Sequence, residues 1–439
     1  MPDPTPAPPM PAFGEAFRFW LKLGFISFGG PAGQMAIMHK ELVEKRRWIS
    51  EPHFLHALNF CMMLPGPEAQ QLATYLGWRL HGVRGGIAAG GLFVLPSIVI
   101  LWALSWIYVT LGDVGWVSAI FYGLNPAVIA IIASAGLRIG RKALKTPAHW
   151  VVAAASFVAI FWFKVSFVWI LAAAAVVGLL GSRWLPRQFP LPKGHGTGTS
   201  DDEAGYLHLP PPPAAGWSRA LKVCAVCLAL WWLPVLAAGA RLGWQGTIFE
   251  QGFFFSKAAL VTFGGAYAVL PYVAQQAVEN HGWLTHPQMM SGLALAETTP
   301  GPLIMVLQFV GFVGAWQHPE GLHPLLAGTL GALITTWATF VPCFLFVFLG
   351  APHVEHLRSR PTLSVVLTAI TAAVVGVIAN LAVWFAWHAV MPAPGKLDWF
   401  VVVVSVVAFV ALQRFKVNAM TVIAACSVLG IVWKLAMAA

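Results

Sequence analysis

Two stretches of the chain follow one pattern: Lys22-Leu23-Gly24-Phe25-Ile26-Ser27-Phe28-Gly29-Gly30 and Lys257-Ala258-Ala259-Leu260-Val261-Thr262-Phe263-Gly264-Gly265. Residue 257 aligns with residue 22, an offset of 235, and the match runs without a gap to Pro65-Gly66-Pro67 and Pro300-Gly301-Pro302. Over this span 12 of 46 aligned positions are identical, whereas average residue usage predicts about three. The chain therefore contains two copies of one structural unit, which is how many secondary transporters are built.

The composition indicates a membrane protein. Hydrophobic residues make up 58% of the 439 residues and charged residues 10%, against about 45–50% and about 25% in soluble domains. This balance excludes a disordered chain, a coiled coil and a conventional nucleic-acid binder, although the formal net charge is +10. Thirteen apolar segments are present, and several exceed the ~20 residues that span a bilayer as a helix. We expect an all-α polytopic membrane protein with two inverted repeats.

A polar stretch separates the two halves. Residues 182–218 are rich in Pro, Gly and charged residues, which is typical of a linker. We therefore expect an N-terminal transporter repeat at 1–181, a cytoplasmic linker at 182–218, a connecting transmembrane helix at 219–240 and an inverted C-terminal repeat at 241–439.

Basic residues indicate how the halves are oriented. The loop 39–47 holds four Lys and Arg residues, its counterpart 274–282 holds none, and the excess alternates along the later loops. Because Lys and Arg collect on the cytoplasmic side, the two halves are predicted to lie upside down relative to each other. The same bias favours re-entrant hairpins over full spans for the four segments 13–37, 54–77, 252–273 and 287–313. A topology in which all thirteen segments cross the membrane stays open.

Breaks in these four segments form the candidate anion site. Paired breaks at matching places in two repeats are typical of transport sites, and half-helix N-termini have unpaired amides that bind anions. Kinks without ligand contact are the alternative. The predicted substrate-binding residues are the break residues and their polar neighbours: Phe28, Gly29, Gly30, Pro65, Gly66, Pro67, Gln70, Gln71, Phe263, Gly264, Gly265, Thr298, Thr299, Pro300, Gly301 and Pro302.

Four ionisable residues are further candidates. Lys22 and Lys257 occupy equivalent positions in apolar segments, which suits binding of a dianion; alternatively, each extends to its nearest membrane interface. Glu68 and Glu297 flank the two Pro-Gly-Pro breaks and are candidates for coupling transport to protons. For Glu68, a favourable interaction with the helix dipole is the other interpretation.

The neutral polar residues also have two interpretations. Thr298 and Thr299 are expected to cap the following half-helix or to donate to a ligand, and Gln70 and Gln71 to donate to an oxyanion or to pair across helices. Pro67 and Pro302 are each expected to open a half-helix, because proline suits the first helical position.

Several motifs resemble the chromate ion transporter family in its long, two-domain form. They are Phe28-Gly29-Gly30-Pro31, Met63-Leu64-Pro65-Gly66-Pro67-Glu68-Ala69-Gln70-Gln71-Leu72-Ala73, Thr262-Phe263-Gly264-Gly265-Ala266-Tyr267 and Glu297-Thr298-Thr299-Pro300-Gly301-Pro302. The resemblance covers nearly the whole chain. It implies a multi-pass protein of the bacterial inner membrane that exports chromate from the cytoplasm and confers chromate resistance. Sulfate, similar in shape and charge, is a plausible competitor.

Two other classes compete with a secondary transporter. One is a passive or differently selective anion channel or transporter, for example for sulfate, that uses the same site. The other is a membrane-embedded reductase, which the absence of flavin, haem and dinucleotide motifs disfavours. The absence of a Walker A motif separately disfavours an ATP-driven pump. We expect no cofactor, no metal and no nucleic-acid partner; the expected partners are the oxyanion and the lipid bilayer, with the oligomeric state open and a homodimer as one option.

Overall fold

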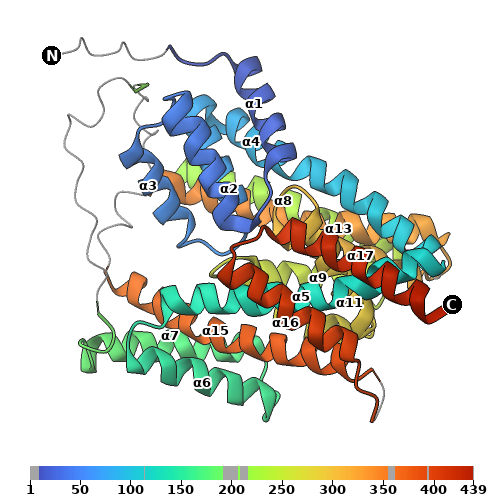
Figure 1. Ribbon diagram of the computed structural model, residues 1–439. Coiled ribbons are helices and arrows are strands. Elements are labelled where there is room, and N and C mark those ends of the chain that lie inside the picture. Colours follow the sequence, from blue (N-terminus) through green and yellow to red (C-terminus); the bar gives the residue numbers. More distant parts are fainter. Residues whose placement is uncertain are drawn as a thin grey trace.

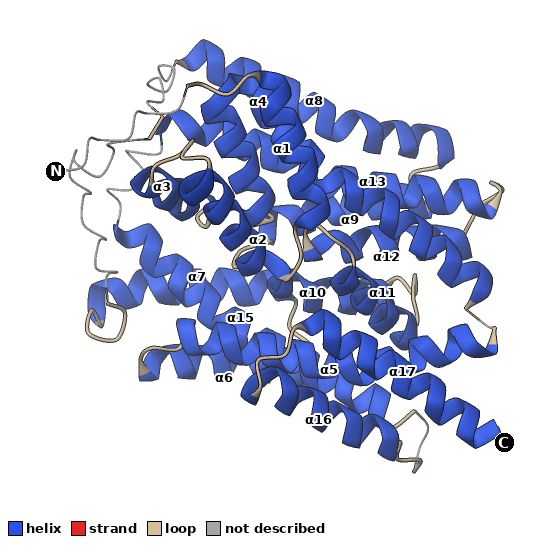
Figure 2. Cartoon of the chain, turned by 45° about the horizontal axis from the view of Figure 1, so that its top comes forward, coloured by secondary structure: helices blue, strands red, loops and turns tan. Residues whose placement is uncertain are grey.

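The computed structural model describes residues 9–112, 114–190, 206–207, 216–353, 361–392 and 395–438. These residues form a bundle of helices, and no β-strand occurs among them (Figures 1 and 2). Seven of the described helices are long and apolar enough to cross a bilayer, which confirms the expected all-α polytopic fold. The predicted linker falls mainly on residues 191–205 and 208–215, which lie outside the described residues.

The helices of the two halves follow the same order. The first half contains α1 (Phe13–Ile26), α2 (Gly30–His39), the π-helical segment η1 (Lys40–Lys45), α3 (Glu51–Cys61), α4 (Glu68–Leu111), α5 (Gly115–Ala143), α6 (Pro147–Phe161) and α7 (Phe167–Trp184). After α8 (Trp217–Leu242), the second half contains α9 (Thr247–Val261), α10 (Ala266–Ala274), η3 (Gln275–Asn280), α11 (His286–Thr298), η4 (Leu303–Met305), α12 (Val306–Gln317), α13 (Pro324–Gly350), η5 (Ala351–His353), α15 (Pro361–Val390), α16 (Trp399–Arg414) and α17 (Ala419–Ala438). The two π-helical segments begin at residues 40 and 275, again 235 positions apart.

Helix α4 is a hairpin of two helical arms. The backbone leaves the helical region at His81 and at Gly82, where φ is +62°. Beyond this turn the arms pack backbone to backbone, since a side chain on Gly77 would collide with the carbonyl of Gly85. Helices α12 and α13 form the corresponding hairpin in the second half, with Gly311 against Gly331. Small residues permit this close approach of helices in a membrane.

Side-chain contacts place the start of α1, the end of η1 and the turn of α4 together at one end of the bundle. Arg46, which follows η1, pairs with Glu15 near the start of α1 at 3.3 Å. His81, at the turn of α4, lies against the ring of Phe13 at 5.6 Å. The chain therefore leaves this end through α1 and returns to it through η1, then leaves through α3 and returns through the first arm of α4. We call this end the first face.

The second half has a corresponding set of contacts. His281, after η3, lies 3.4 Å from Glu250 near the start of α9. Glu320, between α12 and α13, accepts from the backbone N–H of Thr247 at 2.7 Å. These contacts bring the ends of α9, η3 and α12 together at what we call the second face.

Helix α8 connects the two faces. Near its start, the Arg219 guanidinium lies 5.7 Å from the ring of Trp78, close to the turn of α4. Its other end at Leu242 leads directly into α9. Its 26 residues, at ~1.5 Å per residue, span about 39 Å, which is comparable to a bilayer. α8 covers the segment 219–240 and extends slightly beyond it at both ends.

The two halves share one core. α5 of the first half packs against α16 and α17 of the second, and α15 of the second half packs against α6 and α7 of the first (Figure 1). This exchange is reciprocal, as in a two-fold related pair. The buried apolar side chains form a continuous cluster that includes Trp20 and Phe93 from the first half and Phe309 and Phe385 from the second.

Candidate functional site

Both Phe-Gly-Gly motifs interrupt a helix. α1 ends at Ile26 and α2 begins at Gly30, while α9 ends at Val261 and α10 begins at Ala266. All four glycines of the two motifs have positive φ, between +70° and +93°. L-residues rarely adopt this backbone conformation, so glycine is required for the chain to turn here. Each break leaves a short helix whose N-terminal amides begin at the motif.

Both Pro-Gly-Pro motifs also separate helices. α3 ends at Cys61 and α4 begins at Glu68, while α11 ends at Thr298 and η4 begins at Leu303. Pro67 and Pro302 were expected in the first turn of the following helix. Each instead lies just before that helix, because its backbone is extended, with ψ of 105° and 130°.

A crossed pair of hydrogen bonds joins the motifs of the two halves. The N–H of Gly66 donates to the carbonyl of Thr262 at 2.7 Å, and the N–H of Gly301 donates to the carbonyl of Ser27 at 2.7 Å. Ser27 and Thr262 are repeat counterparts, as are the two glycines. Each Pro-Gly-Pro motif therefore lies against the Phe-Gly-Gly motif of the opposite half. The structure brings together breaks that are more than 190 residues apart in the chain. We call this the junction.

Side chains of the long helices α13 and α4 pack closely against Gly66 and Gly301, the central glycines of the two Pro-Gly-Pro motifs. A side chain on Gly66 would lie 2.8 Å from the Cys343 sulfur, and one on Gly301 would lie 2.9 Å from the Ser97 hydroxyl. Ser97 and Cys343 each follow a proline inside a long helix, Pro96 in α4 and Pro342 in α13. The hydroxyl of Ser97 is buried and has no partner within the described part of the chain. A free hydroxyl beside a helix break can donate to an anion.

The glutamines near the junction mostly bond to the protein itself. Gln71 donates to the carbonyl of Pro65 at 2.6 Å, and Gln70 donates to Thr74 at 3.2 Å. Gln34 of α2, which sequence reasoning did not select, donates to the carbonyl of Gly301 at 2.5 Å. Both bonds of Gln70 and Gln71 stay within their own helix and break, so neither is the expected pairing across helices, and donation to an oxyanion stays a prediction.

The threonines before the second Pro-Gly-Pro motif, which we call the second break, do not cap the following helix. The hydroxyls of Thr298 and Thr299 donate to the carbonyl of Leu295 on α11, at 2.8 and 2.7 Å, and η4 has no side-chain cap. The capping interpretation is therefore wrong for η4, because Pro302 and not a threonine occupies its N-cap position.

The two lysines lie on exposed surfaces of their helices. The Lys257 ammonium sits over the ring of Phe253 at 4.3 Å, one turn back along α9 and away from the break that follows Val261. Lys22 is exposed and interacts electrostatically with Glu41 of η1. These contacts are those of side chains that reach along the helix surface, and a binding role for either lysine stays a prediction.

At the second Pro-Gly-Pro break, the candidate Glu297 belongs to a charged cluster whose other members, Tyr267 and Arg138, were not predicted from the sequence. The hydroxyl of Tyr267, in the first turn of α10, donates to the carboxylate of Glu297 at 2.5 Å. The Arg138 guanidinium of α5 interacts with both groups. Tyr267 is buried, Glu297 is half-buried and Arg138 is exposed, so the cluster connects the junction to the protein surface. In the sequence, Arg138 is the first of several basic residues that end an apolar run, so nothing singled it out.

The other acidic candidate has a different environment. Glu68 is the first residue of α4 and is half-buried. It lies close enough to the Cys61 thiol to act on it electrostatically, and no cation comparable to Arg138 accompanies it among its described interactions. Phe28 and Phe263, which precede the two Gly-Gly pairs, are both half-buried at the junction.

Known families and proteins match the chain along most of its length. The model of the family described as "Chromate transporter" matches residues 14–179 and again residues 249–431. The chromate transport protein of Pseudomonas aeruginosa is 32% identical over 431 residues, covering 96% of this chain and 93% of that protein. That of Cupriavidus metallidurans is 29% identical over 407 residues, covering 91% and 89%. A probable chromate transport protein of Synechococcus elongatus is 30% identical over 373 residues, covering 83% and 82%. No solved structure matches the chain.

Proposed function

This chain belongs to the chromate transporter family, and we propose that it is a secondary transporter that exports chromate, or a closely related dianionic oxyanion, from the cytoplasm. It is a multi-pass membrane protein, and export would lower the intracellular chromate concentration and so confer resistance. The observation that carries the proposal is the crossed pair of hydrogen bonds from Gly66 and Gly301, because it assembles four helix breaks into one junction.

An inverted arrangement of the two halves supports this proposal. The hairpins α1–η1 and α3–α4 open toward the first face, and α9–η3 and α11–α12 open toward the second face. α8 carries the chain from one face to the other. Re-entrant helices that meet at mid-depth from opposite sides are the architecture of alternating-access transporters. By the positive-inside bias, the first face, with the basic loop 39–47, would be cytoplasmic.

The junction offers donors suited to a dianion. Four helices start there, at Gly30, Glu68, Ala266 and Leu303, and unpaired N-terminal amides favour negative charge. Ser97 adds a free hydroxyl, and Arg138 supplies a full positive charge near the second break. We assign the binding role to these groups together with the Gly and Pro residues of the breaks, and place Lys22 and Lys257 second.

Glu297 gives a route for proton coupling. An ionised Glu297 carboxylate accepts the hydrogen bond from the Tyr267 hydroxyl and attracts the Arg138 guanidinium. Protonation would remove this competing negative charge and leave Arg138 free for the oxyanion. Protonation of Glu297 would therefore change with each exported dianion: one proton and one dianion would leave together with a net charge of −1, so the membrane potential acting on this charge would drive export and the inward pH gradient would oppose it. A passive channel would need no such change.

Inverted membrane vesicles test the proposal. Vesicles that contain the protein are expected to accumulate radiolabelled chromate against its gradient, and a protonophore is expected to abolish the accumulation. Sulfate is expected to compete. Chromate movement that only equilibrates and ignores the protonophore would favour the channel, and failure to move chromate at all would refute the proposed substrate.

The orientation of the chain can be checked separately. Reporters that are active on one side of the membrane only, fused at Gly196 or after Ala439, are expected to place the linker in the cytoplasm and the C-terminus in the periplasm. The reason is that α8 begins at the first face and that three helices, α15, α16 and α17, follow α13. Activity of both fusions on the same side would contradict the inverted arrangement.

A further inference from the structure

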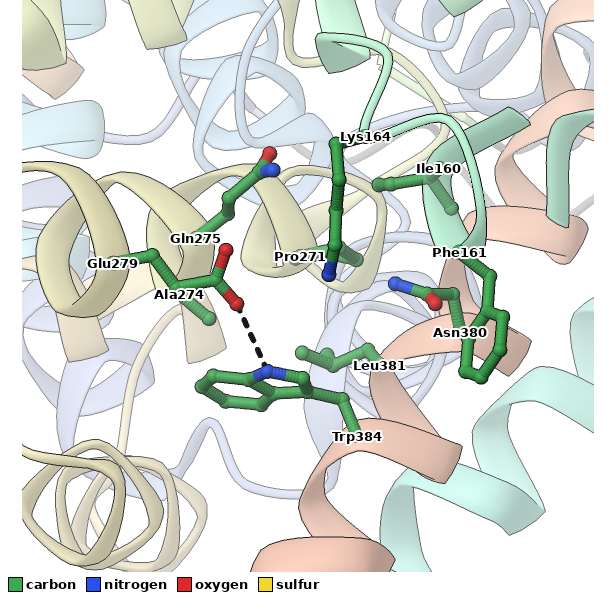
Figure 3. Close-up of a pocket in the computed structure, with 10 residues that line it drawn as sticks. All are labelled: Ile160, Phe161, Lys164, Pro271, Ala274, Gln275, Glu279, Asn380, Leu381 and Trp384. Carbon is green, nitrogen blue, oxygen red and sulfur yellow. Dashed lines mark hydrogen bonds between the residues drawn. The ribbon is translucent and has the colours of Figure 1, made fainter. Parts of the chain in front are cut away.

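A small cavity lies at the second face, away from the junction. Its volume is about 60 Å³. It lies between the turn that joins α6 to α7 in the first half and α10, η3 and α15 in the second half (Figure 3). Its polar lining residues are Lys164, Gln275, Glu279, Asn380 and Trp384, and the remaining five are apolar or proline. At ~15 Å³ per probe-sized water, the cavity has room for about four waters or for the four oxygens of one tetrahedral anion.

Lys164 occupies a backbone position that favours glycine. Its φ is +51°, and the N–H of Val165 donates back to the carbonyl of Ala159 at 3.1 Å, which closes the turn after α6. The turn between α16 and α17 has the same geometry, with Lys416 at φ +52° and the N–H of Val417 bonded to Ala411 at 3.2 Å. Because both turns hold a lysine at this position, the backbone does not distinguish Lys164; the surroundings of its side chain do.

The Lys164 side chain extends into the cavity. Figure 3 shows its ammonium between the amides of Gln275 and Asn380. The one carboxylate in the lining, Glu279, accepts from the indole N–H of Trp384 at 3.0 Å, so part of its hydrogen-bonding capacity is already used. One cation and two amides therefore remain to meet a ligand, and this set suits an anion better than a cation.

The cavity is connected to the junction by a single short helix. α10 begins directly after Gly265 and supplies Pro271 and Ala274 to the cavity wall. Its nine residues span about 13 Å at ~1.5 Å per residue. The cavity therefore lies within about this distance of the second Phe-Gly-Gly break, toward the second face.

We propose that this cavity is a second, transient oxyanion site at the outer end of the transport path, with Lys164 as its cationic residue. The inference rests on the proposed function. Glu279 opposes the anion in this site and weakens its binding, which permits release. Lys416 lies in the matching turn but does not line this cavity.

Exchange of radiolabelled chromate in right-side-out and inverted vesicles tests the site. Lys164→Gly removes the charge and suits the backbone, so the variant is expected to fold; its half-saturating chromate concentration is expected to rise about tenfold in right-side-out vesicles only. Lys164→Arg keeps the charge and is expected to stay near the parent protein. Glu279→Gln keeps a hydrogen-bond acceptor for Trp384 and is expected to lower the half-saturating concentration.

The controls separate this inference from the proposed function. Lys416→Gly, with the same turn geometry, is expected to leave the value in right-side-out vesicles unchanged. Provided that the parent protein exchanges chromate, three results would refute the site. The half-saturating chromate concentration of Lys164→Gly could equal that of the parent, or it could rise equally in right-side-out and inverted vesicles. The third result is a rise in this concentration for Glu279→Gln like the one expected for Lys164→Gly. If the parent protein exchanges no chromate, the proposed function fails, and this inference fails with it.

Discussion

Gly66→Val and Gly301→Val are each expected to reduce chromate transport by about 30-fold or more. The two glycines have φ of +121° and +107°, where a β-branched residue is strained by about 1–3 kcal/mol. An added side chain would also lie 2.8 Å from the Cys343 sulfur or 2.9 Å from the Ser97 hydroxyl, and overpacking of this kind costs about 1–3 kcal/mol. Relief of the strain would break the bond to Thr262 or Ser27 and open the junction.

Transport in vesicles, normalised to the amount of inserted protein, measures this effect. Insertion is expected to persist, because it depends on apolarity summed over ~20 residues. Gly91→Val is the matched control, since Gly91 lies in α4 with nothing within 4 Å of an added Cβ. The junction is not the transport site if both junction variants carry chromate at the parent rate.

The positions of the breaks were predictable from the sequence because their causes are local. Glycine pairs and proline on both sides of a glycine restrict the backbone whatever surrounds them, and the 235-residue offset places them in register. The hairpin direction stays a prediction from the basic residues, which favour the cytoplasmic side of the membrane. The contacts of Arg46 with Glu15 and of His281 with Glu250 agree with that interpretation.

The pairing between halves was not predictable from this chain alone. No local pattern indicates that Gly66 would donate to Thr262, because the two residues are almost 200 positions apart and meet only through the packing of both halves. Side-chain direction was missed for a related reason. Lys257 appeared central by its position, yet its ammonium reaches back over Phe253. Arg138 appeared to be a loop marker, yet it reaches a buried tyrosine.

That cluster gives the sharpest test of proton coupling. Arg138→Gln is expected to reduce transport by about 30-fold or more, because it removes the full positive charge proposed to bind the oxyanion, and a hydrogen bond to a charged group is worth about 1.5–3 kcal/mol. Glu297→Gln is expected to behave differently. The neutral amide imitates the protonated acid and leaves Arg138 without its carboxylate partner, so chromate exchange should continue while accumulation driven by a pH gradient is lost.

The two activities are measured in the same vesicles, as exchange at equal chromate on both sides and as uptake driven by an imposed pH gradient. Arg141→Gln, one turn further along α5 in its exposed last turn, controls for loss of a positive charge and is expected to keep both activities. The double variant Arg138→Gln with Glu297→Gln should give no exchange. The oxyanion then lacks the Arg138 guanidinium that is proposed to bind it, and neutralising residue 297 does not replace that charge. If Glu297→Gln still accumulates chromate in response to the pH gradient, the proton moves through another group, and Glu68 at the first break is the remaining acidic candidate.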